Sequence, residues 1–542
     1  MNTAEALVKL LEDNGVSHIF GHPGEQIIRM YEALNDSSIE HILVRHEQAA
    51  THAADGYART SAKFGVCMST AGPGALNLIM GLATAYKDSV PILAITGDNP
   101  YSLRNEDNFQ TFDLPAVFKE VTIKNFNPTT GREAILEMKE ALDILNNEPR
   151  GPVHFNLPKD VLSDTEGIEE ALNKPFVSKL DYNYGQMNLL VSLLKSSKKP
   201  MILAGAGVIY SGACKLLKDF AENNNIPIVT TYHGRGILDE NLKLNLGLVG
   251  IRGTSLSNYA YLNSDLILSL GAKLSERTIA LGDFNEIKQK IIDVNVNKDH
   301  LKGKLKIYGD VKEVLTTLMS EDLDSEHFRE FNKLWLDEIY TNNIEGPIIG
   351  ADDNSLPLRP QSVIKTIFNT SKGLYVTGDA GSHTTWTMML AKPSKFGEFT
   401  YSGAMSPMGW GVPAAIGVSM AHPNERIVVI CGDGGFQMTI EELATIKEYN
   451  LPITICILNN SQLGIIRQWE ENLSKDLRYQ VDLDNPNFLD IAKAYGICGV
   501  QSNTTEKMVS SLEKSFELNE PFIIETEVRQ EDIPLPNGWD HG

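Results

Sequence analysis

Cysteine is scarce in this sequence, and the spacing of the few cysteines excludes two common kinds of site. The chain has 5 cysteines in 542 residues, and they form neither a CxxC pair nor the spacing of a zinc site. Three of them lie inside apolar, strand-like runs, where cysteine behaves as a small buried apolar residue. We therefore expect free thiols, a reducing compartment and, by default, the cytoplasm.

Positive charge and long apolar runs are scarce as well. Lys and Arg number 48 against 70 Asp and Glu, and this balance argues against binding to the phosphates of a nucleic acid. No run of apolar residues is long enough to cross a membrane, so we expect no membrane span. The first residues, MNTAEALVKLLEDNG, predict an amphipathic helix rather than a signal peptide. The acidic composition does not exclude binding of small phosphorylated molecules, because backbone N–H groups can bind phosphate on an acidic protein.

Short apolar strands alternating with helices are what the sequence has in abundance. This alternation predicts parallel sheets covered by helices on both faces, the doubly wound α/β class. At about 150 residues per domain, the length suits three or four domains. We expect domains over 1–165, 185–320 and 359–542, with 321–358 as a connector that contains a helical stretch.

Twelve segments are expected to be strands. They are 18–20, 41–44, 65–70 and 91–96 in the first domain, PMILAGAGV, IPIVTT, DLILSLGA and KIIDVNV in the second, and LYVTGD, RIVVICGD, ITICILNN and PFIIETEV in the third.

The strongest chemical signal lies in residues 426–460. An apolar strand ends in GDGG at 432–435, a helix is expected over 439–449, and a second strand ends in NN at 459–460. The distance between the two motifs suffices for one βαβ crossover, so two neighbouring parallel strands would end at the same edge of a sheet. GDG alone is more often an ordinary strand-to-helix turn, and NN at this spacing is what favours a site.

Asp433 and Asn460 are expected to meet at that edge, where open α/β sheets bind ligands. A carboxylate and an amide oxygen suit Mg²⁺, and the glycines let the backbone approach a diphosphate. The pattern resembles the GDG and NN motifs of thiamine-diphosphate enzymes. This resemblance implies that thiamine diphosphate and Mg²⁺ bind here, with Asp433, Asn460 and the main-chain carbonyl of Gln462 as metal ligands.

A second motif, RHEQAA, places Glu47 directly after an expected strand. By itself, Glu47 could equally be an acid that caps a surface helix. The resemblance implies instead that Glu47 hydrogen-bonds N1′ of the cofactor's aminopyrimidine and so promotes loss of the proton from C2 of the thiazolium. In this family the glutamate comes from the partner subunit, which implies a homodimer with shared active sites, or a tetramer of such dimers.

A third motif, SGAMSPMGWG at 402–411, precedes an expected helix. Alone, Met408 could be a core residue, but the resemblance implies that it wedges between the two rings of the cofactor and holds them bent. The other residues implied to bind the cofactor are Pro23, Gly24, Gly72, Asn77, Gly381, Ser382, His383, Gly432, Gly434 and Gly435.

Within this family, nearly the whole chain resembles the catalytic subunit of acetolactate synthase (acetohydroxyacid synthase). NNSQLGIIRQW at 459–469 resembles a segment whose tryptophan shapes the site of the second 2-oxo acid, and an arginine in another segment binds that acid's carboxylate. The residues implied to serve the reaction are Trp469, Arg277, Phe109 and Gln110 in EDNFQ, and Lys159 in PKD.

Two places depart from the family's pattern. Glu25 and Gln26 stand where small residues are usual beside the reacting carbon, which puts the substrate in question. In the middle domain, GIRG at 250–253 replaces the usual GMHG close to the family's FAD site. Gly205-x-Gly207 and Asp293 stay compatible with FAD, although GxG after a strand is a weak signal by itself.

The resemblance implies an enzyme that decarboxylates pyruvate and joins the remaining two-carbon unit to a second 2-oxo acid. The product would be acetolactate or acetohydroxybutyrate, early in branched-chain amino acid biosynthesis, and a small regulatory subunit is a conceivable partner. A sibling thiamine-diphosphate decarboxylase or carboligase with another substrate is the main alternative. A non-catalytic paralogue is disfavoured by the intact Glu47, Asp433 and Asn460.

Overall fold

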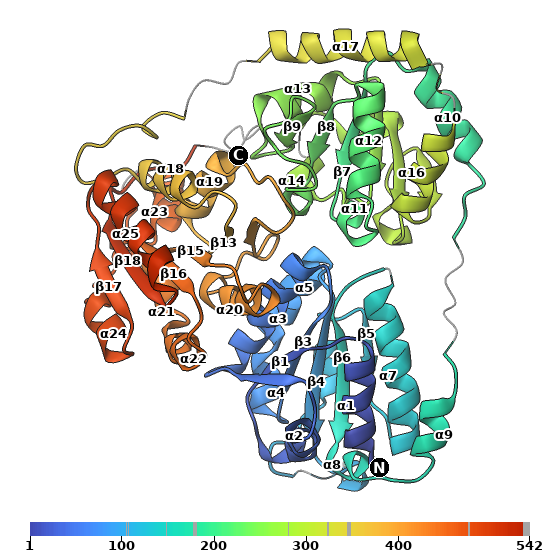
Figure 1. The fold of residues 1–542 in the computed structure, drawn as a ribbon, viewed down its shortest axis with the longest axis vertical. Helices are drawn as coiled ribbons and strands as arrows, with labels where there is room; N and C mark the ends of the chain where they lie inside the picture. Colours follow the sequence, from blue (N-terminus) through green and yellow to red (C-terminus); the bar gives the residue numbers. More distant parts are fainter. Residues whose placement is uncertain are drawn as a thin grey trace. The chain divides into compact units, whose positions relative to one another are not determined.

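The computed structural model describes residues 1–534, apart from 104, 105, 107, 148, 177–181, 280, 322, 324, 344–347, 475 and 476. The described residues contain three sheets, each of six strands with helices on both faces, and the expected α/β class is thereby confirmed (Figure 1). The chain divides into two compact units. The first comprises 1–179, 374–383 and 400–530, and the second comprises 180–373, 384–399 and the residues from 531 onward.

The first sheet has the strand order β2 (Glu40–Leu43), β1 (His18–Gly21), β3 (Gly65–Ser69), β4 (Ile92–Asp98), β6 (Val153–Pro158) and β5 (Lys124–Phe126). All neighbouring pairs are parallel. One face is covered by α1 (Thr3–Asp13), α2 (Ile28–Asn35) and α7 (Gly131–Asn146), and the other by α3 (Glu47–Ser61) and α5 (Ile79–Asp88). Strands β5 and β6 were not expected. The sequence of β5, KNF, is short and half polar, and polar residues interrupt the apolar pattern of β6, VHFNLP.

The third sheet has the order β14 (Phe399–Tyr401), β13 (Tyr375–Gly378), β15 (Ile427–Gly432), β16 (Ile453–Asn459), β18 (Phe522–Glu527) and β17 (Cys498–Gln501). The five strands from β13 to β17 pair in parallel. The four expected strands are all present. The two edge strands, β14 and β17, were missed. Strand β14 has only three residues, and β17 is half exposed, so its sequence CGVQ lacks an apolar run.

Helices α3 and α20 (Gly411–Ala421) pack together between the first and third sheets, and one continuous apolar core joins the two. Their backbones touch at two small residues. A methyl group at Gly56 would lie 2.2 Å from the Ala414 carbonyl oxygen, and one at Gly417 would lie 1.8 Å from that of Ala53. No larger residue fits either position without moving a helix, so this crossing requires glycine in both helices.

The middle sheet has the order β12 (Leu305–Tyr308), β11 (Ile291–Asn295), β10 (Leu266–Leu270), β7 (Pro200–Ala204), β8 (Ile228–Thr230) and β9 (Asn245–Leu248), again parallel throughout. Helices α12 (Cys214–Asn224) and α16 (Val311–Ser320) cover one face, and α13 (Ser255–Asn263) and α17 (Ser325–Thr341) the other. The expected connector, 321–358, therefore begins as part of this domain, because Trp335 and Ile339 of α17 are buried in its core.

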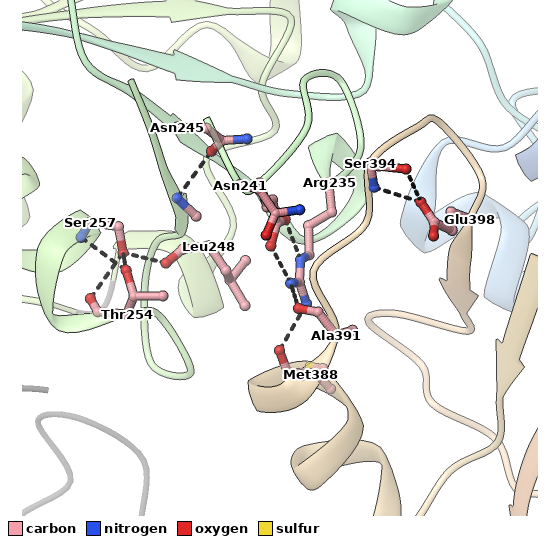
Figure 2. Close-up of polar contacts among 12 residues, drawn as sticks. Arg235, Asn241, Asn245, Leu248, Thr254, Ser257, Met388, Ala391, Ser394 and Glu398 are labelled. Atoms are coloured by element: carbon pink, nitrogen blue, oxygen red, sulfur yellow. Dashed lines mark hydrogen bonds and ion pairs between the residues drawn. The ribbon is translucent and has the colours of Figure 1, made fainter. Parts of the chain in front are cut away.

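Arg235 joins residues 384–399 to the middle sheet's unit. Its guanidinium donates to the carbonyl oxygens of Met388 at 2.8 Å and Ala391 at 2.5 Å (Figure 2). It also pairs with Glu240. A buried guanidinium with carbonyl and carboxylate acceptors is well satisfied. The segment is thus attached to the second unit although its neighbours in sequence belong to the first.

The remaining helices connect these elements. They are α4 (Pro73–Asn77), α6 (Leu114–Phe118), α8 (Lys159–Leu162), α9 (Ile168–Asn173), α10 (Met187–Ser196), α11 (Gly207–Tyr210), α14 (Glu276–Ile279), α15 (Phe284–Ile287), α18 (Pro360–Thr370), α19 (Ser382–Leu390), α21 (Asp433–Gln437), α22 (Leu443–Glu448), α23 (Gly464–Leu473), α24 (Phe488–Ala494) and α25 (Thr505–Leu518), with short 3-10 turns between them. Within the described residues, none of the helices has the length and apolar character to cross a membrane.

Candidate functional site

The carboxyl edge of the third sheet brings together the expected metal ligands. Gly432 of β15 pairs with Leu458 of β16, so Asp433 and Asn460 leave the same edge side by side. The backbone N–H of Gln462 donates to the Asn460 side-chain oxygen at 3.2 Å. Burial raises the pKa of Asp433, whose residue is only 2% exposed, and a cation would stabilise its charged form.

Asn485 completes this cluster and was missed from the sequence. Its amide donates to Asp433 at 2.7 Å and to the side-chain oxygen of Asn459 at 3.0 Å, and Gln437 donates to its oxygen at 2.9 Å. It therefore orients the carboxylate of Asp433 from a loop 52 residues further along the chain. The only signal in the sequence is an Asn-Pro-Asn turn before α24, which is too common to indicate a site.

Beside this edge, the segment after β13 supplies further polar groups. The hydroxyl of Ser382 is buried and makes no hydrogen bond among the described residues. A methyl group at Gly464 would lie 3.1 Å from the Asn460 amide nitrogen and 3.2 Å from the Ser382 oxygen, so these two polar groups flank one point. His383 lies against Gly432, and burial lowers its pKa to about 4, which keeps its imidazole neutral at neutral pH.

The loop that carries Met408 is fixed by the buried carboxylate of Asp379. This carboxylate accepts the backbone N–H groups of Gly409 at 2.9 Å and Gly411 at 3.2 Å, and burial raises its pKa to about 6. The terminal methyl of Met408 lies 3.3 Å from a methyl group placed at Gly434. Met408 thus projects toward the glycine turn at the end of β15.

Glu47 lies at the carboxyl edge of the first sheet, at the start of α3. The amide of Asn77 donates to its carboxylate at 2.9 Å, and a methyl group at Gly74 would lie 3.0 Å from its other oxygen. A side chain at Gly74 would therefore push against Glu47. The strand-to-helix turn before Glu47 is closed by His46, whose ring accepts the N–H of Gln48 at 3.2 Å.

Comparisons with known proteins match the two sheets that carry these groups and the sheet between them in sequence. Models of the N-terminal, central and C-terminal domains of thiamine pyrophosphate enzymes match residues 1–117, 187–318 and 379–526. The chain belongs to the thiamine pyrophosphate enzyme family. It is also 36% identical to a probable acetolactate synthase large subunit of Methanocaldococcus jannaschii, over 97% of this chain and 91% of that protein. An acetolactate synthase large subunit of Lactococcus lactis is 34% identical over 98% and 93%.

The resemblance expected from the motifs is thus confirmed, and the chain is an acetolactate synthase-like member of the thiamine pyrophosphate enzymes. The polar groups of the third sheet suit the diphosphate and metal of this cofactor. A buried hydroxyl without a partner at Ser382 suits a phosphate oxygen, and the oxygen ligands of Asp433 and Asn460 suit a hard divalent cation. No group of three His, Cys, Asp or Glu side chains suited to a metal occurs among the described residues.

Other family positions surround the edge of the first sheet. Gly24 and Gly72 are both required by close approaches, since a methyl group at either would lie within 3.0 Å of Thr70 and of the Gln110 backbone, respectively. Gly72 also has φ +58°, which favours glycine. Gln110 is therefore beside the turn that contains Gly72, whereas Phe109 is 75% exposed and has its carbonyl held by Asn99. Pro23 precedes Gly24 in the turn after β1.

The unusual Glu25 has a partner in this unit. Lys159, at the start of α8, lies 3.0 Å from its carboxylate, and both side chains are largely exposed. Gln26 instead points inward, at 6% exposure, with a side-chain oxygen that has no hydrogen-bond partner among the described residues. The two departures from the family pattern therefore differ. Glu25 pairs with Lys159 at the surface, whereas Gln26 is buried.

The two residues expected to serve the second substrate lie on separate units. Arg277 is in α14 of the second unit, where its carbonyl oxygen accepts the N–H of Ile251 at 3.0 Å. Trp469 is half-buried in α23 of the first unit.

Gly381, with φ +146°, turns the chain into α19 just before Ser382 and His383. A methyl group at Gly435 would lie 3.2 Å from the carboxyl carbon of Asp379.

Proposed function

We propose that the protein decarboxylates pyruvate and joins the two-carbon unit to a second 2-oxo acid, forming acetolactate from pyruvate and acetohydroxybutyrate from 2-oxobutyrate. The observation that carries the proposal is the pairing of two intact sites in an acetolactate synthase-like chain. Asp433 and Asn460 share one sheet edge, and Glu47 is held by Asn77 at another. The relatives are named large subunits, which supports a small regulatory partner and an oligomer; the sharing of active sites between subunits is part of the proposal.

The first group of residues would hold the cofactor's diphosphate and its metal. Asp433, Asn460 and the carbonyl of Gln462 would ligate Mg²⁺, and Ser382 and His383 would donate hydrogen bonds to phosphate oxygens. Neutral His383 can donate without adding charge. Thiamine diphosphate, when bound, supplies a carbon nucleophile and accepts the electron pair that decarboxylation leaves behind.

The second group would orient the reacting end. Glu47 would hydrogen-bond N1′ of the aminopyrimidine, and Asn77 would keep the Glu47 carboxylate at the right place for that bond. Met408 would hold the two cofactor rings in the bent arrangement. Arg277 would bind the carboxylate of the second 2-oxo acid with a two-pronged contact, and Trp469 would limit the space for its side chain.

The salt bridge between Glu25 and Lys159 gives a specific reason to keep a second candidate function. Lys159, which matches a family lysine, is paired here with Glu25. The carboxylate offsets the positive charge of Lys159, so the attraction for an anionic substrate is weaker. A sibling decarboxylase or carboligase with another 2-oxo acid would fit this arrangement. FAD in the middle domain is part of the proposal for the synthase, with Asp293 of β11 buried in that sheet.

Product analysis separates these functions. Purified protein with thiamine diphosphate, Mg²⁺ and FAD is given pyruvate, with and without 2-oxobutyrate, and acetolactate, acetohydroxybutyrate and acetaldehyde are quantified. The synthase predicts acetohydroxy acids as the main products. Acetaldehyde alone would favour the decarboxylase, and no turnover of pyruvate with intact cofactor binding would favour a sibling with another substrate. Bound flavin, measured on the protein as purified, tests the FAD site separately.

A further inference from the structure

Glu442 is a fully buried carboxylate, and its hydrogen bonds among the described residues go to Arg45, His46 and Thr445 rather than to the proposed metal ligands. It ends the short 3-10 turn Ile440–Glu442 before α22 and is 0% exposed. One of its oxygens accepts two backbone N–H groups, from Arg45 at 2.8 Å and from His46 at 3.0 Å. These are the two residues that directly precede Glu47, so a side chain of the third sheet's domain holds the turn that delivers Glu47.

The other oxygen of Glu442 is fixed by its own helix. Thr445 donates to it at 2.7 Å and also lies 3.1 Å from the carbonyl oxygen of Leu43, the last residue of β2. One turn further along, the Tyr449 hydroxyl accepts the N–H of Leu43 at 2.9 Å and donates to the carbonyl of His41 at 3.2 Å. Helix α22 and the residues at its two ends therefore hold both the end of β2 and the turn after it.

A carboxylate is well suited to this task. Two N–H groups at the end of a strand have no partner in the sheet, and buried donors of this kind require an acceptor. A side chain of this length with a terminal oxygen can reach both N–H groups at once. With Asn77 holding the Glu47 side chain at 2.9 Å, the residue is fixed from both sides, at its carboxylate and at the backbone before it.

We propose that Glu442 is a positioning residue, which sets the place of Glu47 by holding the backbone of Arg45 and His46. The proposal rests on the proposed role of Glu47 toward the cofactor. According to this proposal, the length of the side chain at position 442 matters more for holding the turn than its charge does. Gln keeps the length of the side chain and an oxygen that can accept from both N–H groups, whereas Asp keeps the charge but is one carbon shorter.

The first measurement is amide hydrogen exchange of the full-length protein without cofactor, in peptides that cover residues 41–50. Glu442→Ala should speed exchange at Arg45 and His46 by about tenfold or more, because their acceptor is removed. Glu448→Gln is the matched control, since Glu448 is at the other end of α22 and pairs with the guanidinium of Arg45, at 2.5 Å, rather than with its backbone N–H. This control should stay within about twofold of the unmodified protein.

The second measurement is the rate at which the C2 proton of bound thiamine diphosphate exchanges with solvent, at saturating cofactor. The expected order is Gln above Asp above Ala at position 442, with Gln within about threefold of the unmodified protein and Ala lower by about tenfold or more. The control Glu448→Gln should match the unmodified protein. If the Ala variant does not fold, the C2 exchange rates of the Gln and Asp variants still test whether the reach of the side chain at position 442 positions Glu47.

Two results would overturn the proposal. One is unchanged amide exchange at Arg45 and His46 in Glu442→Ala. The other is an Asp variant that exchanges C2 faster than the Gln variant, which would mean that the charge of Glu442 matters rather than its reach. If the unmodified protein exchanges C2 no faster than Glu47→Gln does, the proposed function fails, while amide exchange still tests whether Glu442 holds the turn.

Discussion

The buried ion network of Asp55, Arg59 and Asp88 predicts a large and specific loss of stability. The guanidinium of Arg59 is 4% exposed and donates to Asp55 at 2.7 and 3.2 Å and to Asp88 at 2.8 Å. Asp55 also accepts the indole N–H of Trp410 at 2.8 Å, two residues after Met408. The network thereby ties α3 to the start of α20, and Asp88 accepts the N–H of Ala404 at 3.0 Å.

Replacing Asp55 by Ala removes the bidentate partner of Arg59 and the acceptor of Trp410 together. Removing one member of a buried ion pair costs about 3–5 kcal/mol, because the other charge stays buried. The orphaned indole N–H adds about 1 kcal/mol or more, but Arg59 keeps Asp88, so we expect a total of about 4 kcal/mol. The exposed pair of Arg29 and Glu32, at 2.5 Å, provides a control, since Arg29→Ala should cost less than about 1 kcal/mol.

Urea unfolding measures the difference, and amide exchange in α3 and α20 assigns it to the unit that contains the network, because a chain of several domains need not unfold in one step. An Asp55→Ala cost no greater than that of Arg29→Ala would refute the reasoning. Asp88→Asn gives an internal check. It keeps an oxygen for the Ala404 N–H and leaves the Asp55 contact intact, so it should cost only about 1–2 kcal/mol.

Four further outcomes are expected. Glu47→Gln should abolish pyruvate turnover while calorimetry shows that thiamine diphosphate still binds, and unchanged turnover would remove Glu47 from the mechanism. Asp433→Ala should weaken Mg²⁺-dependent cofactor binding by more than about tenfold, because one amide and one carbonyl are poor ligands for a hard cation, and a calorimetric change within about twofold would contradict this. Arg277→Ala should cut acetohydroxy acid formation by about 30- to 150-fold and acetaldehyde release much less, whereas equal losses would exclude a role at the second substrate. Burial raises the pKa of Glu442 from 4.5 to about 7. The folded protein thus binds this proton more tightly than the unfolded chain, so the group's contribution to stability falls by about 3 kcal/mol as pH rises from 4.5 to 7. Glu442→Gln should remove that fall, as measured by urea unfolding at the two pH values.

The sequence by itself determined the fold class, most strands and the cofactor family. These follow from local patterns. Apolar strands that alternate with helices predict the fold class, and glycine-rich turns directly after a strand are typical of a diphosphate site. Asp433 and Asn460 could be placed together in advance, because one crossover between two motifs fixes them as ends of neighbouring parallel strands. Strands β5, β9, β12, β14 and β17 escaped this reasoning, since each is a short strand at the edge of its sheet. Strand β6 escaped it as well, because His154 and Asn156 interrupt its apolar residues.

Only the tertiary structure decided which distant residues support the site. Asn485 reaches Asp433 from 52 residues away, and Glu442 holds the turn before Glu47 from nearly 400 residues away. Such pairs leave no local periodicity, because a single side chain and a backbone N–H can meet from any two positions in the chain. The same holds for Gly56 and Gly417, whose absent side chains let α3 and α20 touch. Spacing along the chain reveals neighbours in one sheet, whereas contacts between layers depend on how the sheets and helices pack.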